Sequence, residues 1–173
     1  KNESYTLLVK NYAKQEEERL DSYSALMNLS TSTIADMKAG GATQAEIERF
    51  MYTFIKEYNA AYKGLSIRCY GLFNGRYMID VEGFSSQDLA DYDYSKSPWY
   101  VQAMNNDGQA AVTDSYTDYF TGRTCVTISQ RIKGTDDVLC FDLFFSDRVR
   151  SDEQIVMPTG CSYYLFDTQG NVV

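Results

Sequence analysis

The amino-acid sequence predicts an α+β fold in which two N-terminal helices pack on an antiparallel sheet. Apolar residues recur at helical spacing through residues 2–58, Asn74-Gly75 separates two apolar runs, and two later apolar runs flank a polar turn at residues 134–137. The 173 residues are enough for a domain with its own core. We assign residues 1–62 to a helical region, residues 63–150 to the sheet-bearing module and residues 151–173 to the start of a second module.

The two helices are predicted from periodicity and capping signals. The first is expected from Asn2 to about Lys38, where apolar residues alternate with charged runs such as KQEEER, and the glycine pair at residues 40–41 ends it. Thr43 and Glu46 form a T-x-x-E capping box, which predicts the start of a second helix. Its apolar face is expected to hold Ile47, Phe50, Met51, Phe54, Ile55 and Tyr58.

Antiparallel strands are expected from LSIRCYGLFNGRYMIDVEG onward, because Asn-Gly favours a two-residue hairpin turn. Residues 84–98 lack periodicity and are expected to form a loop, followed by a short helix at WYVQAMNN. The stretches RTCVTISQRI and VLCFDLFFSD are expected to be strands, and alternation in the second places Asp142 opposite the face of Leu139, Phe141 and Leu143. The tail SYYLFDTQGNVV suggests a strand, a glycine turn and another strand.

Composition excludes several classes of function. The chain has no histidine, which is the commonest general base and metal ligand, and its net charge of −8 repels nucleic-acid phosphates. We therefore expect no cofactor, no metal site and no nucleic-acid partner. The four cysteines are expected to be buried free thiols, with disulfides as the alternative; they are Cys69, Cys125, Cys140 and Cys161. No apolar run is long enough to span a bilayer and no signal peptide is evident, so we expect a soluble fragment of a larger protein.

Between Tyr92 and Asp147, short motifs follow one another in a fixed order. Tyr92 precedes the corner SPWY, Tyr116 and Asp118 form a Y-x-D pair, and TGRTCVTIS and CFDLFFSD follow. This order resembles that of Cache sensor domains, specifically the membrane-distal module of a double Cache domain. The resemblance implies a PAS-like (Cache) sheet, with residues 63–150 as the ligand-binding module of the extracytoplasmic, periplasmic or cell-surface part of a bacterial receptor. The tail resembles the entry into the family's membrane-proximal module.

The resemblance also implies a binding site. In amino-acid-binding members, the arginine of an RPWY corner holds the ligand carboxylate, and the Y-x-D pair and a later aspartate hold the ammonium group. Here Ser97 stands in the place of that arginine, and a hydroxyl cannot make the bidentate contact of a guanidinium. The expected ligand-binding residues are Tyr92, Ser97, Trp99, Tyr100, Tyr116, Asp118 and Asp142.

These residues favour a cationic ligand. Asp118 and Asp142, expected to be unpaired, would repel each other in one pocket until an ammonium group joined them, and the aromatic faces add cation-π attraction. Lys96 is expected to point away from the side of Ser97, because residues before a proline are extended. The prediction is a sensor of a small amine, or of an amino acid whose carboxylate is held by a group other than arginine.

Other functions stay open at this point. One is a Cache-like dimerisation or spacer module without a small-molecule ligand, and another is a sensor of a carboxylate or a purine. Asp114 and Asp118 would be the carboxylate pair of a glycoside hydrolase, but nothing marks either as the acid, so we expect no enzyme in this fragment. The resemblance implies a homodimer in the full receptor, membrane attachment through flanking transmembrane helices, and an output domain of chemoreceptor, histidine kinase or diguanylate cyclase type.

Overall fold

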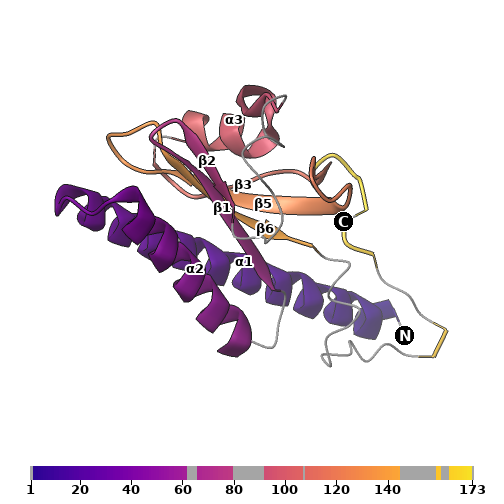
Figure 1. Cartoon of the computed structure of the whole chain (residues 1–173). Coiled ribbons are helices and arrows are strands. Elements are labelled where there is room, and N and C mark those ends of the chain that lie inside the picture. The colour runs from indigo at the N-terminus through magenta and orange to yellow at the C-terminus, as the bar shows by residue number, and fades with distance from the viewer. Residues whose placement is uncertain are drawn as a thin grey trace.

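A computed structural model describes residues 2–61, 66–79, 92–106, 108–144, 159–160 and 164–172, with the backbone alone at residues 2–5 and 77–79. The expected α+β architecture is confirmed: two long helices cover one face of an antiparallel sheet, and a short helix covers the other (Figure 1). Most of the expected loop, at residues 84–91, and Cys161 lie outside the described residues. In the described part of the chain, no helix combines the length and apolar character that crossing a membrane requires.

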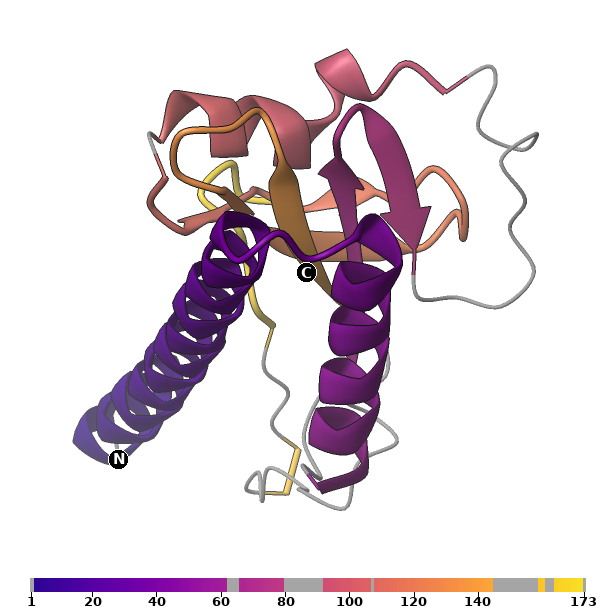
Figure 2. The same ribbon diagram turned by 60° about the vertical axis from the view of Figure 1, so that its left-hand side comes forward.

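Helix α1 (Asn2–Ala39) and helix α2 (Gln44–Ala61) diverge from the turn that joins them (Figure 2). Gly41 in that turn has a φ of 82°, a conformation that residues with a Cβ rarely adopt. The predicted capping box is confirmed, because the backbone N–H and the hydroxyl of Thr43 donate to Glu46 Oε2 at 2.7 and 2.8 Å. Asn59 then ties α2 to the sheet by donating to the carbonyl of Ile67 and accepting from its N–H, at 2.8 and 2.9 Å.

The sheet has the strand order β2-β1-β6-β5-β3, with β4 paired to β5 beside this path, and every pairing is antiparallel. The strands are β1 (Ile67–Phe73), β2 (Arg76–Ile79), β3 (Ala111–Val112), β4 (Tyr116–Thr117), β5 (Thr124–Arg131) and β6 (Val138–Leu143). The predicted hairpin is confirmed at Asn74 and Gly75, whose φ values of 51° and 71° suit a type I′ turn.

The main core lies between the sheet and the two long helices. It contains Tyr23, Met27, Ile34, Ile47, Met51, Ile55, Ile67, Cys69, Phe73, Ile128, Ile132, Leu139, Phe141 and Leu143. The alternation predicted for β6 is therefore confirmed, since Leu139, Phe141 and Leu143 face the helices while Asp142 lies on the other face. Burying side chains of this size stabilises the fold by about 1.5–3 kcal/mol each, which fixes the register of β6 and hence the position of Asp142.

The other face of the sheet carries the short helix α3 (Pro98–Asn105), which confirms the helix expected there. A smaller core lies beneath it, made of Tyr70, Trp99, Ala103, Val138 and Cys140. Ser97, directly before Pro98, is extended as expected, with φ −68° and ψ 138°. Lys96 is not extended but ends the 3₁₀ turn η1 (Tyr94–Lys96), because the carboxylate of Asp93 accepts from the N–H of Ser95 and starts a turn.

The thiols follow the expectation of buried free cysteines at all three described positions, Cys69, Cys125 and Cys140. Burial raises the pKa of Cys125 to about 12, so this thiol stays protonated and unreactive at neutral pH. The division of the chain into a second module from residue 151 stays a prediction.

The C-terminal segment is anchored to the sheet-bearing part of the chain. Phe166 and Val172 form an isolated antiparallel bridge around a glycine turn. Between them, the carboxylate of Asp167 accepts from the N–H and the hydroxyl of Ser115 at 3.1 and 2.7 Å. Ser115 directly precedes β4, so the segment holds one end of the strand that carries part of the site.

Candidate functional site

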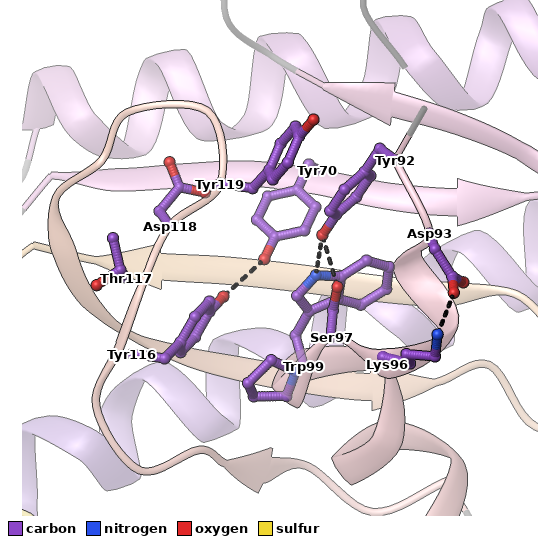
Figure 3. Close-up of a pocket in the computed structure, with 11 residues that line it drawn as sticks. Tyr70, Tyr92, Asp93, Lys96, Ser97, Trp99, Tyr116, Thr117, Asp118 and Tyr119 are labelled. Atoms are coloured by element: carbon purple, nitrogen blue, oxygen red, sulfur yellow. Dashed lines mark hydrogen bonds and ion pairs between the residues drawn. The ribbon is translucent and has the colours of Figure 1, made fainter. Parts of the chain in front are cut away.

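A cavity of about 240 Å³ lies between the segment that enters α3 and strands β1 and β4 (Figure 3). It is lined by Tyr70, Tyr92, Asp93, Lys96, Ser97, Pro98, Trp99, Tyr116, Thr117, Asp118 and Tyr119. Pockets for drug-sized ligands measure about 300–1,000 Å³, so this cavity suits a smaller molecule. Aromatic rings form its walls, and the side chains of the Y-x-D pair reach it from β4 and from the residue directly after β4.

One wall is a hydrogen-bonded set formed by Tyr92, Ser97 and Trp99 (Figure 3). The indole N–H of Trp99 donates to the hydroxyl oxygen of Tyr92 at 3.1 Å, and this hydroxyl lies 2.7 Å from Ser97 Oγ. Ser97 precedes α3 but makes no side-chain capping bond, so its hydroxyl is available to Tyr92 and to the cavity. Burial raises the pKa of Tyr92, which therefore stays a neutral hydroxyl.

Trp99 is only 1% exposed and is held edge-on to Tyr70 and Tyr100, at centroid distances of 5.5 and 5.7 Å. Such edge-to-face pairs contribute about 0.5–1.5 kcal/mol each beyond the area they bury. Tyr100 packs on the smaller core and is not among the residues that line the cavity. The ring of Tyr119 lies 4.7 Å from that of Tyr92, centroid to centroid, and Tyr119 is more than half exposed. Tyr119 therefore forms the outer edge of the cavity.

Asp118 lies at the end of β4 and is 6% exposed. Its Oδ2 accepts from Arg68 Nη1 at 2.9 Å, and also from the N–H and hydroxyl of Thr121 at 2.8 and 2.6 Å. The expectation that the aspartates are unpaired is therefore wrong: a buried guanidinium from β1 neutralises Asp118. A salt bridge of this kind orients the carboxylate toward its partners and limits its repulsion of Asp142.

Asp142 lies beneath the cavity and is fully buried, at 0% exposure. Its Oδ1 accepts from the hydroxyls of Tyr70 and Thr127 at 2.9 and 2.6 Å, and its Oδ2 lies 3.9 Å from Arg68 Nη1. Burial raises the pKa of Asp142 to about 7, although the two hydroxyl hydrogen bonds oppose the rise. Asp142 does not line the cavity, so its link to the cavity runs through hydroxyl groups.

The structure thus brings five of the seven predicted residues to the cavity wall and leaves Tyr100 and Asp142 behind it. Arg68, Tyr70 and Thr127 were missed by the sequence reasoning. Strand pairing sets Arg68 and Thr127 directly opposite Asp142, on β1 and β5, and this register comes from the fold and not from a local motif. The sequence carried one signal. The alternation that singled out Asp142 on β6 applies equally to the polar pair Arg68 and Tyr70 on β1.

Contrary to the expectation, the side chain of Lys96 does not point away from the side of Ser97. The 3₁₀ turn brings it to the same cavity rim as Ser97, rather than to the opposite side of an extended segment. Its side chain is 86% exposed and its ammonium group lies 3.2 Å from Asp93 Oδ2. Lys96 is therefore a solvated rim residue already paired with an acid.

The carboxylates weighed for glycoside hydrolysis have separate partners. The hydroxyl of Thr168 donates to Asp114, whereas Asp118 pairs with Arg68. Among the described residues, no group of three or more acidic or cysteine side chains is placed to hold a metal ion.

The fold and cavity define a class of protein, a PAS-like ligand-sensing domain. The family described as methyl-accepting chemotaxis protein-like, first PDC sensor domain, matches residues 5–141. The chain belongs to this family. The family is one of sensor domains rather than of enzymes.

Two curated relatives come from Bacillus subtilis. Methyl-accepting chemotaxis protein TlpB is 34% identical over 80 residues, which cover 46% of this chain and 12% of the relative. Methyl-accepting chemotaxis protein McpB is 31% identical over 85 residues, which cover 49% of this chain and 12% of the relative. The chain therefore aligns with only a small part of each receptor.

Similar solved structures are chemoreceptor ligand-binding domains. That of Campylobacter jejuni Tlp3 with 4-methylisoleucine has a TM-score of 0.68 at 21% identity, covering 95% of this chain and 65% of that one. That of Pseudomonas aeruginosa PctB with L-Arg has a TM-score of 0.65 at 19% identity, covering 90% of this chain and 62% of that one. At these identities the comparison shows a shared fold.

Proposed function

We propose that this domain senses a small molecule carrying an ammonium group, an amine or an amino acid, bound in the cavity between the SPWY corner and the sheet. The observation that carries the proposal is the position of Asp118, a buried carboxylate that lines a cavity walled by aromatic rings. Carboxylates and aromatic faces together recognise organic cations, and each well-placed ring adds about 0.5–2 kcal/mol.

The buried charges support a cationic ligand. Arg68 supplies one positive charge, and Asp118 and Asp142 supply two negative charges when both are ionised. The set is therefore one positive charge short at a pH where Asp142 is ionised. A ligand ammonium group beside Asp118 would balance the set; Arg68, which pairs with Asp118 but does not line the cavity, would oppose it in part, and the two carboxylates together would attract it.

A carboxylate on the ligand would meet a hydroxyl and a rim lysine rather than an arginine. When Tyr92 donates to Ser97, the hydroxyl proton of Ser97 is free to donate toward the cavity, and Lys96 stands at the rim. Both contacts are weaker than a bidentate guanidinium contact. We therefore assign the ammonium group the larger share of the affinity, with Tyr92, Ser97, Trp99, Tyr116 and Asp118 in contact with the ligand, Asp142 beneath them and Tyr100 supporting Trp99.

The similar solved structures support a ligand of the amino-acid class. They were solved with L-valine, 4-methylisoleucine, GABA and L-Arg, all of which carry both an ammonium group and a carboxylate. These ligands belong to those receptors. For this chain they indicate a class of ligand that a domain of this fold accommodates.

In the receptor, we place this domain as the membrane-distal module of a double Cache pair on the extracytoplasmic side, attached to the membrane through flanking helices. Signalling would follow from a difference in ligand affinity between two arrangements of a homodimer. Chemotaxis is the output that the family match favours over histidine kinase or diguanylate cyclase activity.

A thermal-shift screen of the purified domain tests the proposal. The decisive compounds are L-valine and two analogues that each lack one of its charged groups: isobutylamine lacks the carboxylate, and 3-methylbutanoate lacks the ammonium group. GABA, L-arginine and adenine are also tested. A compound that binds the folded domain raises the melting temperature by mass action. We expect L-valine or isobutylamine to stabilise the domain and 3-methylbutanoate to have no effect.

Two results would contradict the proposal. Stabilisation by 3-methylbutanoate or adenine without stabilisation by any amine would assign a different ligand class. A folded domain that none of the compounds stabilises would favour a dimerisation or spacer role without a small-molecule ligand.

A further inference from the structure

Four oxygen atoms lie in a ring beneath the cavity, and three hydroxyl protons are shared among them. Asp142 Oδ1 is bonded to the hydroxyls of Tyr70 and Thr127, at 2.9 and 2.6 Å. The hydroxyl of Tyr116 closes the ring, at 2.6 Å from Thr127 Oγ1 and 3.4 Å from the Tyr70 hydroxyl oxygen. Figure 3 shows the hydroxyls of Tyr70 and Tyr116 turned toward each other at the cavity.

The direction of each hydrogen bond follows from counting protons. A hydroxyl has one proton, and those of Tyr70 and Thr127 both point to the carboxylate of Asp142. The Tyr116 proton then has an acceptor within the ring, and the nearer one is Thr127 Oγ1. The oxygens of Tyr70 and Tyr116, both of which line the cavity, are left as acceptors toward a ligand.

The charge of Asp142 maintains this acceptor surface. An ionised carboxylate draws both hydroxyl protons toward itself, whereas a protonated one accepts more weakly. Burial raises the pKa of Asp142 to about 7, and its Oδ2 has no hydrogen-bond partner among the described residues. The groups that face Asp142 are Arg68 and Tyr70 from β1, Cys125 and Thr127 from β5, Tyr116 and Asp118 from the β4 segment, and Cys140 from its own strand.

Arg68 is the single cation among those facing groups, and its Nη1 lies nearer to Asp118 than to Asp142, at 2.9 against 3.9 Å. Asp142 is thus the less well compensated of the two acids and the one that gains more from a new positive charge nearby. A proton or a ligand ammonium group can each supply that charge.

We propose that Asp142 is a positioning residue that acts on the ligand through the hydroxyls of Tyr70 and Thr127, and that it releases its proton to solvent when a ligand ammonium group binds above these hydroxyls. The inference rests on the proposed function and adds Tyr70 and Thr127 to the site. It makes ligand affinity pH-dependent: an amine with a pKa near 10 keeps its own charge below pH 9, so the pH dependence below that point comes from the protein. As pH increases toward about 7, ligand affinity rises by up to tenfold per pH unit, and above about pH 7 it stays constant.

The first experiment needs no ligand. NMR of the domain with ¹³Cγ-labelled aspartate follows each carboxyl group through a titration from pH 4 to 9, and the Asp142 signal is the one lost in Asp142→Asn. We expect its midpoint near pH 7 in the wild-type domain and higher in Tyr70→Phe and Thr127→Val, since each variant removes a donor that favours the ionised form. A midpoint near pH 4 in the wild-type domain would overturn the inference.

The second experiment measures the proton directly. Isobutylamine and L-valine are titrated into the wild-type domain at pH 6 by calorimetry in two buffers with different ionisation enthalpies. We expect close to one proton released per ligand bound in the wild type, none in Asp142→Asn, and wild-type behaviour in Asp114→Asn, which leaves the ring intact. Binding without proton release would overturn the inference and leave the proposed function standing. If neither compound binds between pH 5 and 9, the proposed function fails and the linkage fails with it.

Discussion

Arg68 Nη1 on β1 lies 2.9 Å from Asp118 Oδ2 at the end of β4, and both side chains are more than 90% buried. The two residues are 50 positions apart in the sequence and meet because β1 and β4 flank the central strands β6 and β5. The pair sets the orientation of the carboxylate that we assign to the ligand. It also joins the stability of the domain to the integrity of the site.

Breaking this pair from the Arg68 side should be costly. Arg68→Met leaves Asp118 buried without its cation, which typically lowers the free energy of unfolding by about 3–5 kcal/mol. Urea unfolding measures the change. The matched control is Asp136→Asn, which removes the partner of Arg131 in an exposed pair and should cost less than about 1 kcal/mol. Equal effects of the two variants would show that the Arg68 pair is not a buried electrostatic contact.

The titration of Asp142 should make stability fall as pH rises. Its pKa is about 7 in the folded domain against 3.8 for an unperturbed aspartate, so the folded state holds the proton more tightly than the unfolded chain. This contribution to stability is complete below about pH 4 and is lost as pH rises through about 7, at up to about 1.4 kcal/mol per pH unit. Unfolding free energies from pH 5 to 8 should decline in the wild type and be nearly flat in Asp142→Asn. Parallel slopes in the two proteins would contradict the assignment.

Gly71 in β1 should not tolerate a side chain. A Cβ at this position would lie 2.3 Å from Phe73 Cε2 and 2.6 Å from the carbonyl oxygen of Val138, and the latter belongs to the backbone and cannot move aside. Gly71→Ala should therefore destabilise the domain by about 1–3 kcal/mol through overpacking, measured by urea unfolding. Gly40→Ala is the control, because a Cβ there meets its nearest atom at an ordinary 3.4 Å. A Gly71→Ala protein as stable as this control would mean that β1 and β6 pack less tightly than described.

The two hydrogen bonds from Ser115 to Asp167 should protect the amide groups at the start of β4 from hydrogen exchange. Hydrogen bonds from Ser115 and Asn171 hold the pKa of Asp167 well below its usual range. The stabilisation from these hydrogen bonds is therefore complete above about pH 4 and is lost as pH falls further and the carboxylate is protonated. At pH 7, Asp167→Ala should speed amide hydrogen exchange at Ser115 and Tyr116, while exchange in α2 stays unchanged. Unaltered exchange at both positions would show that the C-terminal segment does not hold β4.

Most of the fold is predictable from the sequence because its signals are local. The capping box at Thr43, the Asn74-Gly75 turn and the alternation of β6 each depend on residues within one turn or strand, and all three were confirmed. The 3₁₀ turn before α3 was missed, because Pro98 constrains only Ser97, which is extended, while the Asp93 side chain starts a turn in the residues before Ser97.

The site was predictable only in part, because its contacts depend on strand register and on helix geometry. Arg68 reaches Asp118 through the pairing of four strands, which no local motif reveals. Tyr100 follows Trp99 in the SPWY corner, but successive residues of a helix point about 100° apart. Trp99 therefore faces the cavity while Tyr100 packs behind it.

Trp99 offers the most direct test of the central claim that the cavity beside Asp118 binds an ammonium ligand. It is the chain's one tryptophan, it is buried and it lines the cavity, so its fluorescence reports on occupancy of this site. Titrating the domain with the amine or amino acid that stabilises it should produce a saturable change in Trp99 emission. The affinity should fall at least tenfold in Asp118→Asn and stay unchanged in Asp114→Asn. A stabilising ligand that leaves Trp99 emission unaltered, or that binds Asp118→Asn as tightly as the wild type, would contradict the account.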